Sequence, residues 1–475
     1  MGRITPVIDI SPPRKLSEAA RKPPGGRLIR KLATFGRLSF LSFFRTGQAY
    51  ALCIFQGRTV NSIVPKPRER NRLTRRDLFQ WSGATAAAIG LSRLAAARAG
   101  VELQLQEAVA KLQYLTPLDR AFILDKGKAG VAKLPPEKLR ELGLIPDTWA
   151  LEVVTDPASN SVVGRQLARA SGNALDWNAL MKLADRHAIR FMHVCTCTNG
   201  TNPFHMSLWE GVPLREVMGI VDPKDNVRRV YYQSYHPDGI PTFQSSLPMG
   251  QIMETPPGQI PVILAYKMNG QVIPASHGGP VRMIVPGAYG SKSIKWVQRI
   301  VLTNEFKAND SDADLNNDPE NGLKTRARFI NEPKEIPAGR QAAITGMAQV
   351  GISGLRKVQY CLHSQKSSWP ADDPYRIRAD WQDAAVLPPP ENWGGGLPAG
   401  KLPLTAQMDP STGKPLQWPL PYAIVHWAAL LPGLETGSYD LCCRTIDGNG
   451  IAQPLPRTLP RTGLNTIQVV TLIVK

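Results

Sequence analysis

Short apolar runs bounded by turn residues predict a chain rich in strands and poor in long helices. "IRFMHVC" (189–195) and "PVILAYKM" (261–268) are runs of this kind. Asn269-Gly270 after the second run is typical of a hairpin turn, because both residues tolerate positive φ. Just before the first run, "LDWNALMKLADRHA" (175–188) spaces its apolar residues as one helix face behind a capping Asp. The middle of the chain is therefore predicted to be a mixed α+β domain.

A polar stretch separates this region from the last third of the chain. "KANDSDADLNNDPENG" (307–322) spaces its aspartates as a calcium loop does, but Leu315 stands where such a loop needs Gly and Asn321 where it needs Glu. We therefore expect a solvated linker. From Pro337 onward the apolar runs are short, separated by turns and without a helical period, which predicts a β-sandwich.

The net charge of +19 belongs mainly to the first hundred residues. Residues 1–99 hold 19 Lys+Arg against 4 Asp+Glu, whereas the other residues hold 38 against 34. A strongly basic folded domain would be typical of a nucleic-acid-binding protein. Because the excess lies in the leader, the composition does not favour a nucleic-acid partner.

The leader has the layout of an export signal. Arg75-Arg76 precedes an Ala/Gly-rich apolar segment (84–91), and "ARA" (97–99) supplies the small residues of a cleavage site. This order resembles a twin-arginine signal and predicts a periplasmic protein. Residues 1–70 are long and basic for the start of such a signal, so we expect translation to begin nearer the twin arginine.

Cys195 and Cys197 stand one residue apart at the end of a predicted strand, just ahead of an Asn-Gly turn. Zinc could recruit His193 and His205 as well, but side chains on one face of a strand lie about 6–7 Å apart, too far for adjacent tetrahedral ligands. A disulfide within Cys-Thr-Cys would close a strained ring. Two interpretations stay open from the residues alone: packing of both thiols, or one thiolate ligand to a metal held mainly by an organic cofactor.

A long segment downstream carries a family resemblance. "HGGPVRMIVPGAYGSKSIKWVQRIVLT" (277–303) resembles the molybdopterin-binding segment of the sulfite oxidase family, with its His-Gly, Pro-Val-Arg, Val-Pro and Lys-Trp elements in the same order. "LWEGVPLREVM" (208–218) and "SSLPMGQIMETPPGQIPVILAYKMNGQVIP" (245–274) resemble neighbouring segments of that family. "LTPLDRAFILDKG" (115–127) stands where its first segment belongs, and the likeness covers roughly 110–475.

The resemblance implies an α+β fold, a mixed sulfite-oxidase-type molybdopterin domain followed by an immunoglobulin-like β-sandwich. In that family the second domain mediates dimerisation, and "GMAQVGISGLRKVQYCLH" (346–363) resembles its strands. We therefore expect a leader with a twin-arginine signal at 1–99, a molybdopterin-binding catalytic domain at 100–325 and an immunoglobulin-like dimerisation domain at 326–475. A homodimer formed through the last domain follows from the same resemblance.

The resemblance also implies that the cysteine region binds molybdenum. In the family this strand ends in Cys-x-x-Asn, whereas here Asn199 follows Cys195 by four residues and Cys197 by two. The hydrophobic strand favours Cys195 and the spacing to Gly211 favours Cys197; Cys195 is the preferred ligand. Positive charge and directional donors suit the phosphate and rings of the pterin. The residues implied to hold this molybdenum-molybdopterin cofactor are Asn199, His277, Arg282, Ser293, Ile294 and Lys295.

Two positions depart from the family. Leu124 stands where the family carries an anion-binding Arg, and Phe243 where it carries an active-site Tyr. Losing a guanidinium and a hydroxyl removes hydrogen bonds to an oxyanion, so the resemblance leaves the substrate open. Cys195 and Phe243 belong to the predicted catalytic set. The residues that could rebuild a polar pocket beside them are Lys126, His205, Tyr235, His236 and Tyr289.

These features predict an exported molybdenum-pterin oxidoreductase of the sulfite oxidase or dehydrogenase type, which moves an oxygen atom between water and a small-molecule substrate. Because no Cys-x-x-Cys-His haem motif occurs in the sequence, we expect no haem in this chain and a separate electron carrier, a c-type cytochrome. A reductase of a sulfoxide or other S- or N-oxide is one alternative, and a non-catalytic binding or assembly protein is another. Export would also allow a disulfide from Cys361 to Cys442 or Cys443.

Overall fold

The computed structural model describes most of the chain after residue 102. The chain divides into two units, 1–70 and 71–475. The predicted twin-arginine signal and its cleavage site lie outside the described residues. The residues that the structure describes are 43–45, 48–50, 54–55, 58–59, 103–121, 123, 130–197, 205–234, 243–314, 318–454, 463 and 465–475.

Four short strands are described in the first unit, as two antiparallel pairs. The first pair is β1 (Phe43–Arg45) with β2 (Gln48–Tyr50), and the second is β3 (Ile54–Phe55) with β4 (Arg58–Thr59). All other described elements belong to the second unit.

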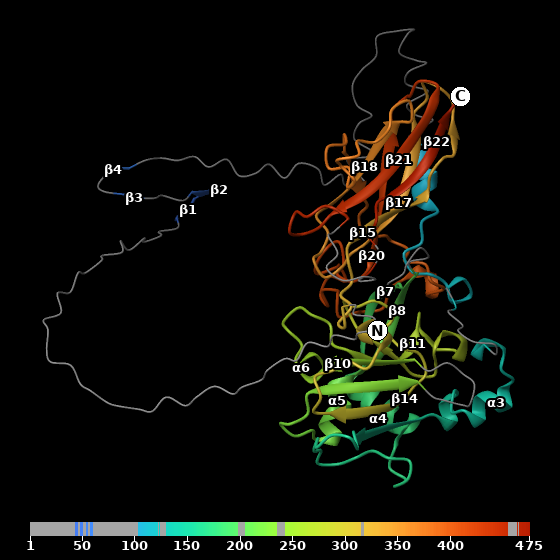
Figure 1. Ribbon diagram of the computed structural model, residues 1–475, viewed down its shortest axis with the longest axis vertical. Coiled ribbons are helices and arrows are strands. Elements are labelled where there is room, and N and C mark those ends of the chain that lie inside the picture. Colours follow the sequence, from blue (N-terminus) through green and yellow to red (C-terminus); the bar gives the residue numbers. More distant parts are fainter. Residues whose placement is uncertain are drawn as a thin grey trace, which may run out of the picture. The chain divides into compact units, whose positions relative to one another are not determined.

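Two five-stranded sheets build the middle of the chain (Figure 1). The strands of the first sheet, in order, are β10 (Gln244–Pro248), β9 (Arg229–Ser234), β14 (Val297–Thr303), β5 (Ala150–Thr155) and β6 (Leu175–Asp176). Those of the second are β12 (Gln271–Val272), β11 (Ile263–Met268), β8 (His205–Pro213) and β7 (Ile189–Cys195), with β13 (Arg282–Ile284) against β11. Paired strands are antiparallel except β14 and β5. The expected mixed α+β region is confirmed.

The helices that accompany these sheets are short. α4 (Trp177–His187) follows β6, and its N-cap Asp176 accepts a hydrogen bond from the Ala179 backbone N at 2.7 Å. The predicted helix at 175–188 is confirmed by α4, and the strand predicted after it is confirmed by β7. The other helices are 103–110, α3 (Pro136–Glu141), α5 (Leu214–Val221), α6 (Met249–Met253) and α7 (Ser311–Asp314), with 3-10 turns η2 (Leu118–Arg120), η3 (Val131–Lys133), η4 (Pro146–Thr148), η5 (Ala275–His277) and η6 (Pro398–Gly400).

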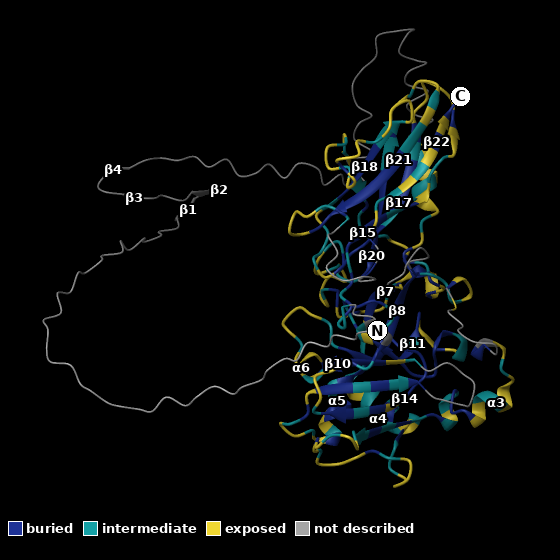
Figure 2. Ribbon diagram, in the orientation of Figure 1, coloured by how far each residue is buried: buried dark blue, intermediate teal, exposed yellow. Residues whose placement is uncertain are grey.

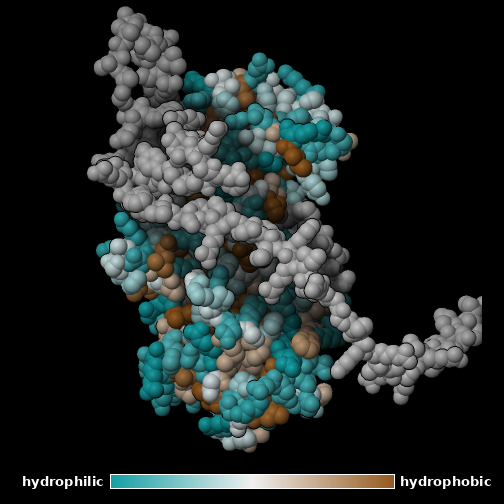
Figure 3. Space-filling model, turned by 90° about the vertical axis from the view of Figure 1, so that its left-hand side faces the viewer, coloured by the Kyte–Doolittle hydropathy of each residue, from teal (hydrophilic) through white to brown (hydrophobic). Residues whose placement is uncertain are grey.

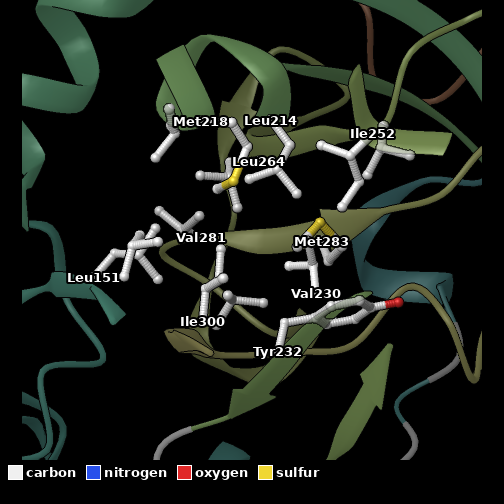
Figure 4. Close-up of a cluster of buried hydrophobic side chains, with 14 of the residues drawn as sticks. Leu151, Leu214, Met218, Val230, Tyr232, Ile252, Leu264, Val281, Met283 and Ile300 are labelled. Carbon is white, nitrogen blue, oxygen red and sulfur yellow. The ribbon is translucent and has the colours of Figure 1, made fainter. Parts of the chain in front are cut away.

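The main hydrophobic core joins the two sheets (Figure 4). Leu151 and Ile300 of the first sheet pack in one cluster with Leu264 and Met283 of the second and with Leu214 of α5. All five side chains are fully buried, and burial of a side chain of this size contributes about 1.5–3 kcal/mol. The core therefore fixes the second sheet, which carries Cys195, on the first.

Hydrophobic side chains are scattered over the visible part of the face that Figure 3 shows. Phe306, Ile352 and Leu416 are among those exposed, and Figure 3 shows hydrophobic residues as separate groups among hydrophilic ones. Within the described ranges no helix combines the length and the apolar character needed to cross a membrane.

The last third consists of strands and turns with a core of its own. Trp427 and Val425 are fully buried at its centre, and the dark strands of Figure 2 show how much of it is buried. The short strands expected from Pro337 onward are confirmed. The strands, in hydrogen-bonded order, are β15 (Arg326–Asn331), β17 (Ala342–Gln349), β20 (Ile424–Leu431), β19 (Gln382–Val386), β18 (Lys357–Ser364), β21 (Gly437–Ile446), β22 (Gln468–Val474) and β16 (Glu335–Ile336).

The last third also covers the free edge of β7. The Val194 backbone N donates to the Tyr422 carbonyl at 2.8 Å. The Gln407 side chain accepts from the Met192 backbone N at 2.8 Å and donates to the Met192 carbonyl at 3.1 Å. An uncovered edge strand would leave such groups without protein partners. The strand that ends in Cys195 is therefore hydrogen-bonded on both sides.

Asp310 shows that the expectation of a solvated linker at 307–322 was wrong at this position. Its carboxylate is buried and accepts hydrogen bonds from Lys292 Nζ at 2.8 Å and from Ser245 Oγ at 2.9 Å. Lys292 is fully buried and also donates to the Ser246 carbonyl at 2.9 Å. A run of polar residues in the sequence does not indicate that one of them pairs with a buried lysine of another segment.

We expect Asp310→Asn to lower the free energy of unfolding by about 3–5 kcal/mol, because it leaves the Lys292 ammonium buried without its counter-charge. The matched control is Glu335→Gln, which breaks an exposed ion pair with Lys475 and should cost less than about 1 kcal/mol. Urea unfolding followed by tryptophan fluorescence measures both variants. An Asp310→Asn cost no larger than that of the control would contradict the buried pair.

Candidate functional site

Cys195 is the centre of a buried group of polar side chains on the second sheet. It pairs in register with His205, the first residue of β8, and residues directly opposite each other in antiparallel strands share a face. Arg282, the first residue of β13, brings Nη2 to 4.0 Å from Cys195 Sγ. The Arg282 guanidinium also lies 5.3 Å from the centre of the Trp209 ring. Three strands therefore bring a thiol, an imidazole and a guanidinium together.

A tight turn brings His277 and Lys295 to the same group. Gly278 has φ +98°, and a Cβ there would lie 2.5 Å from Lys295 Cγ, so the turn requires glycine. His277 Nε2 donates to the Leu118 carbonyl at 3.1 Å, which assigns the ring proton to this nitrogen. The His277 carbonyl accepts from Arg282 Nη1 at 3.1 Å, so the turn also orients the guanidinium.

Ser293 and Ile294 support this arrangement from behind. Ser293 Oγ accepts from the Val285 backbone N at 3.0 Å, and the Ser293 carbonyl accepts from Arg282 Nε at 3.1 Å. The Ile294 side chain packs in the main core, and its carbonyl accepts from the Met283 backbone N at 3.1 Å. Both residues position β13 and Arg282, a role that the family resemblance alone did not specify.

Burial keeps the imidazoles beside Cys195 neutral. Burial, followed by the charge of Arg282, lowers the pKa of His193 to about 3 and the pKa of His205 to about 3. Burial raises the pKa of the Cys195 thiol, while the charges of Arg282 and Lys295 act in the opposite direction. The positive charge of the group therefore resides on the guanidinium and the ammonium.

The group fits an anionic ligand that carries many hydrogen-bond acceptors. Among the residues that the structure describes, no carboxylate lies within 4 Å of the buried Arg282 guanidinium, whose hydrogen bonds go to two carbonyls and to Cys195. In the same group, and again among the described residues, His205 Nε2 and both ring nitrogens of His193 are buried without a hydrogen-bond partner. Buried charges are normally paired and buried polar atoms hydrogen-bonded. A bound anionic ligand would pair with the Arg282 charge and would also give the buried ring nitrogens of His193 and His205 a hydrogen-bond partner.

A metal at this place would need ligands from elsewhere. The described residues contain no cluster of three or more His, Cys, Asp or Glu side chains that could hold an ion by themselves. The zinc interpretation of Cys195, Cys197, His193 and His205 is therefore not supported. A single thiolate with a metal carried by an organic cofactor remains compatible with the geometry.

Cys197 lies in different surroundings from Cys195, being exposed just beyond the end of β7. The intervening Thr196 is held from two sides: its carbonyl accepts from the Gly290 backbone N at 2.8 Å, and its hydroxyl accepts from Arg326 Nη2 at 3.2 Å. Arg326 is buried at the start of β15, and burial lowers its pKa to about 10. Arg326 was not predicted from the sequence, because no local pattern indicates a contact between segments that lie so far apart along the chain.

The remaining predicted residues have other surroundings. The Phe243 ring lies 5.7 Å from that of Trp296 and packs against the main core. Tyr289 is fully buried in a cluster shared with the last third, and its hydroxyl accepts from the Lys324 backbone N at 3.3 Å. The predicted site residues that lie outside the described part of the chain are Lys126, Asn199, Tyr235 and His236.

Known proteins share this fold and parts of this sequence. Residues 146–310 match the family model described as "Oxidoreductase molybdopterin binding domain". The chain is 35% identical over 101 residues to nitrate reductase [NADPH] of Fusarium oxysporum, covering 21% of this chain and 11% of that protein. It is 32% identical over 108 residues to mitochondrial sulfite oxidase of Mus musculus, covering 22% and 19%. The chain thus matches less than a fifth of the length of these two relatives.

A solved structure extends the likeness in fold. The sulfane dehydrogenase SoxCD from Paracoccus pantotrophus superimposes with a TM-score of 0.50 at 18% identity, covering 76% of this chain and 82% of that one. Fold and sequence together define a molybdopterin-binding oxidoreductase domain. Residues 146–310 are therefore a molybdopterin-binding oxidoreductase domain similar in sequence to those of sulfite oxidase and nitrate reductase, and molybdenum-molybdopterin is the cofactor of that domain. The resemblance drawn from residues 277–303 is confirmed.

We expect Arg282→Met to reduce the molybdopterin retained after desalting by about tenfold or more, since hydrogen bonds to a charged group contribute about 1.5–3 kcal/mol. The matched control is Arg299→Met on an exposed position of β14, which removes the same charge away from the site. Fluorescence of the released, oxidised pterin measures the content, and circular dichroism checks folding. Equal pterin content in two folded variants would contradict the assignment of Arg282.

Proposed function

We propose that the chain is an exported molybdenum-pterin oxidoreductase of the sulfite oxidase or dehydrogenase type. It moves an oxygen atom between water and a small sulfur-containing substrate and passes two electrons to a separate carrier, a c-type cytochrome. The observation that carries this proposal is the buried Arg282 guanidinium, 4.0 Å from Cys195 Sγ, in a group in which His205 Nε2 and both ring nitrogens of His193 have no hydrogen-bond partner. The twin-arginine layout of the leader supports export to the periplasm.

Different residues around Cys195 would bind different parts of the cofactor. Cys195 Sγ would bind the molybdenum, because it is the sulfur that faces the guanidinium, whereas Cys197 is exposed. Arg282 and Lys295 would neutralise the anionic groups of the pterin, and His205 Nε2 would give it a directional hydrogen bond. The bound cofactor supplies two-electron oxygen-atom transfer. The protein orients it and keeps water from the Cys195 sulfur, whose residue is only 6% exposed.

Sulfite is the first candidate substrate because a second buried cation borders the cysteine segment. Arg326 holds the Thr196 hydroxyl from the last third of the chain, where its guanidinium could bind an oxyanion in place of the arginine that Leu124 replaces. SoxCD, which shares the fold, is described as a sulfane dehydrogenase. A reduced sulfur compound is therefore a further substrate to assay.

Phe243 favours the alternative, reduction of a sulfoxide or other S- or N-oxide. Its ring packs on Trp296 and supplies no hydroxyl to an oxyanion. An uncharged substrate would need neither that hydroxyl nor the missing arginine. A non-catalytic binding or assembly protein finds support only in these two departures, and the group around Cys195 argues against it.

The last third is proposed to be an immunoglobulin-like dimerisation domain. The eight strands that the structure describes there pack around a separate hydrophobic core, which a domain of this kind requires. Through Arg326 and the cover on β7 it also contributes to the site of its own chain. A homodimer formed through this region follows from the family resemblance.

Protein purified from a host that makes the cofactor should carry close to one molybdenum per chain and oxidise sulfite with an artificial electron acceptor. Elemental analysis measures the metal, and dye reduction measures turnover, with sulfoxide reduction by a reduced dye assayed beside it. Faster sulfoxide reduction would favour the alternative. A folded sample without metal and pterin would overturn the proposal.

Arg326 provides an internal check on the substrate. Arg326→Met should raise the KM for sulfite by about tenfold, the loss of a charged hydrogen bond, and leave the KM for a sulfoxide unchanged. Arg340→Met, at an exposed turn of the same region, is the matched control. An unchanged KM for sulfite in a metal-loaded Arg326→Met variant would contradict the proposal that Arg326 binds the anion.

A further inference from the structure

A second pair of cysteines lies in the last third, away from the cofactor group. Cys361 on β18 and Cys442 on β21 are register partners in neighbouring antiparallel strands, so their side chains share one face of the sheet. Both are buried, at 1% and 0% exposure. Cys443 points to the opposite face, because side chains alternate along a strand, and it packs in the core around Trp427.

A polar and aromatic cover lies over this pair. Trp369 Nε1 donates to Asp440 Oδ2 at 2.6 Å, and the Trp369 ring stacks on His363 with centres 4.0 Å apart. The Arg376 guanidinium lies 4.3 Å from the centre of the Trp369 ring, and its Nη1 donates to Cys442 Sγ at 3.2 Å. The connection between β18 and β19 thus aims a positive charge at one of the two sulfurs.

The surroundings make the two thiols chemically unequal. A hydrogen bond from Cys361, with help from the Arg376 charge, lowers the pKa of the Cys442 thiol against the effect of burial. The same hydrogen bond and burial raise the pKa of Cys361. Cys442 is therefore the sulfur that ionises, and Cys361 is the neutral partner beside it.

We propose that Cys361 and Cys442 are a dithiol that closes to a cross-strand disulfide on reaction with a small-molecule disulfide, which reaches the buried Cys442 when the connection between β18 and β19 opens. Cys442 Sγ, as thiolate, attacks one sulfur of the oxidant and releases the other half as a thiol, leaving a mixed disulfide on Cys442. Cys361 Sγ then displaces the second half. The chain loses two protons and two electrons, and the oxidant leaves as two thiols.

The strand geometry permits this bond. Directly opposite residues have Cβ atoms about 4.5–5.5 Å apart, and a disulfide needs about 3.5–4.5 Å, so a shift of an ångström or less within the sheet suffices. A bond to Cys443 would require a thiol on the other face. The structure therefore assigns Cys442 rather than Cys443 as the partner of Cys361, a choice the sequence left open.

The test is oxidation of the purified full chain with glutathione disulfide, followed by unfolding, alkylation and peptide mass mapping. The expected product has two fewer alkylated thiols and a cross-link that joins the peptide of Cys361 to the peptide of Cys442 and Cys443. Cys443→Ser should retain this cross-link, and Cys442→Ser should lose it. A chain in which Cys361 stays fully alkylated, or a cross-link lost only in Cys443→Ser, overturns the proposal.

The role of the cover has its own readout, the rate of oxidation near neutral pH. Arg376→Gln should slow closure by about tenfold, because loss of the guanidinium raises the pKa of the Cys442 thiol and lowers the fraction of reactive thiolate. Arg378→Gln, in the same connection but paired with Asp372 at an exposed position, should leave the rate unchanged. Equal rates in the two folded variants contradict activation by Arg376.

Discussion

Hydrogen bonding along both edges of β7 is the constraint on which the site depends. One edge pairs with β8 over the whole strand, and the other is held by Tyr422 and Gln407 from the last third. A slip of one residue would turn every side chain of the strand to the other face. A strand held on two sides keeps one register, so Cys195 meets Arg282 rather than the opposite face of the sheet. The site therefore depends on the last third of the chain as well as on the second sheet.

Two buried cations of the middle region differ in whether the protein itself supplies a counter-charge. Lys292 is neutralised within the protein, because Asp310 lies 2.8 Å away and a backbone carbonyl accepts a second hydrogen bond. In the described part of the chain, Arg282 donates hydrogen bonds to two carbonyls and a thiol and lies against an aromatic ring, with no carboxylate to pair with it. Its positive charge is left for a ligand. This contrast separates a stabilising pair from a binding site more clearly than residue type does.

The sequence predicted well the features that arise locally. The helix before Cys195, the strand that ends there and the Asn269-Gly270 turn follow from spacing and turn chemistry, and the long cofactor segment was recognisable by its order of motifs. The contacts of Arg326 with Thr196 and of Asp310 with Lys292 were not predictable, because both join segments whose letters give no sign of their partner. Ser293 and Ile294 were assigned to the cofactor, whereas in the structure Ser293 hydrogen-bonds to the Val285 backbone and to Arg282, and Ile294 packs in the main core.

The central claim is that Cys195 alone supplies the protein sulfur to the metal in a buried cationic site. X-ray absorption at the molybdenum edge counts the sulfur neighbours of the metal in the intact protein and in the single Cys195→Ser and Cys197→Ser variants. The account predicts one sulfur fewer in Cys195→Ser and an unchanged count in Cys197→Ser. Loss of the sulfur in Cys197→Ser with Cys195→Ser unchanged would contradict it.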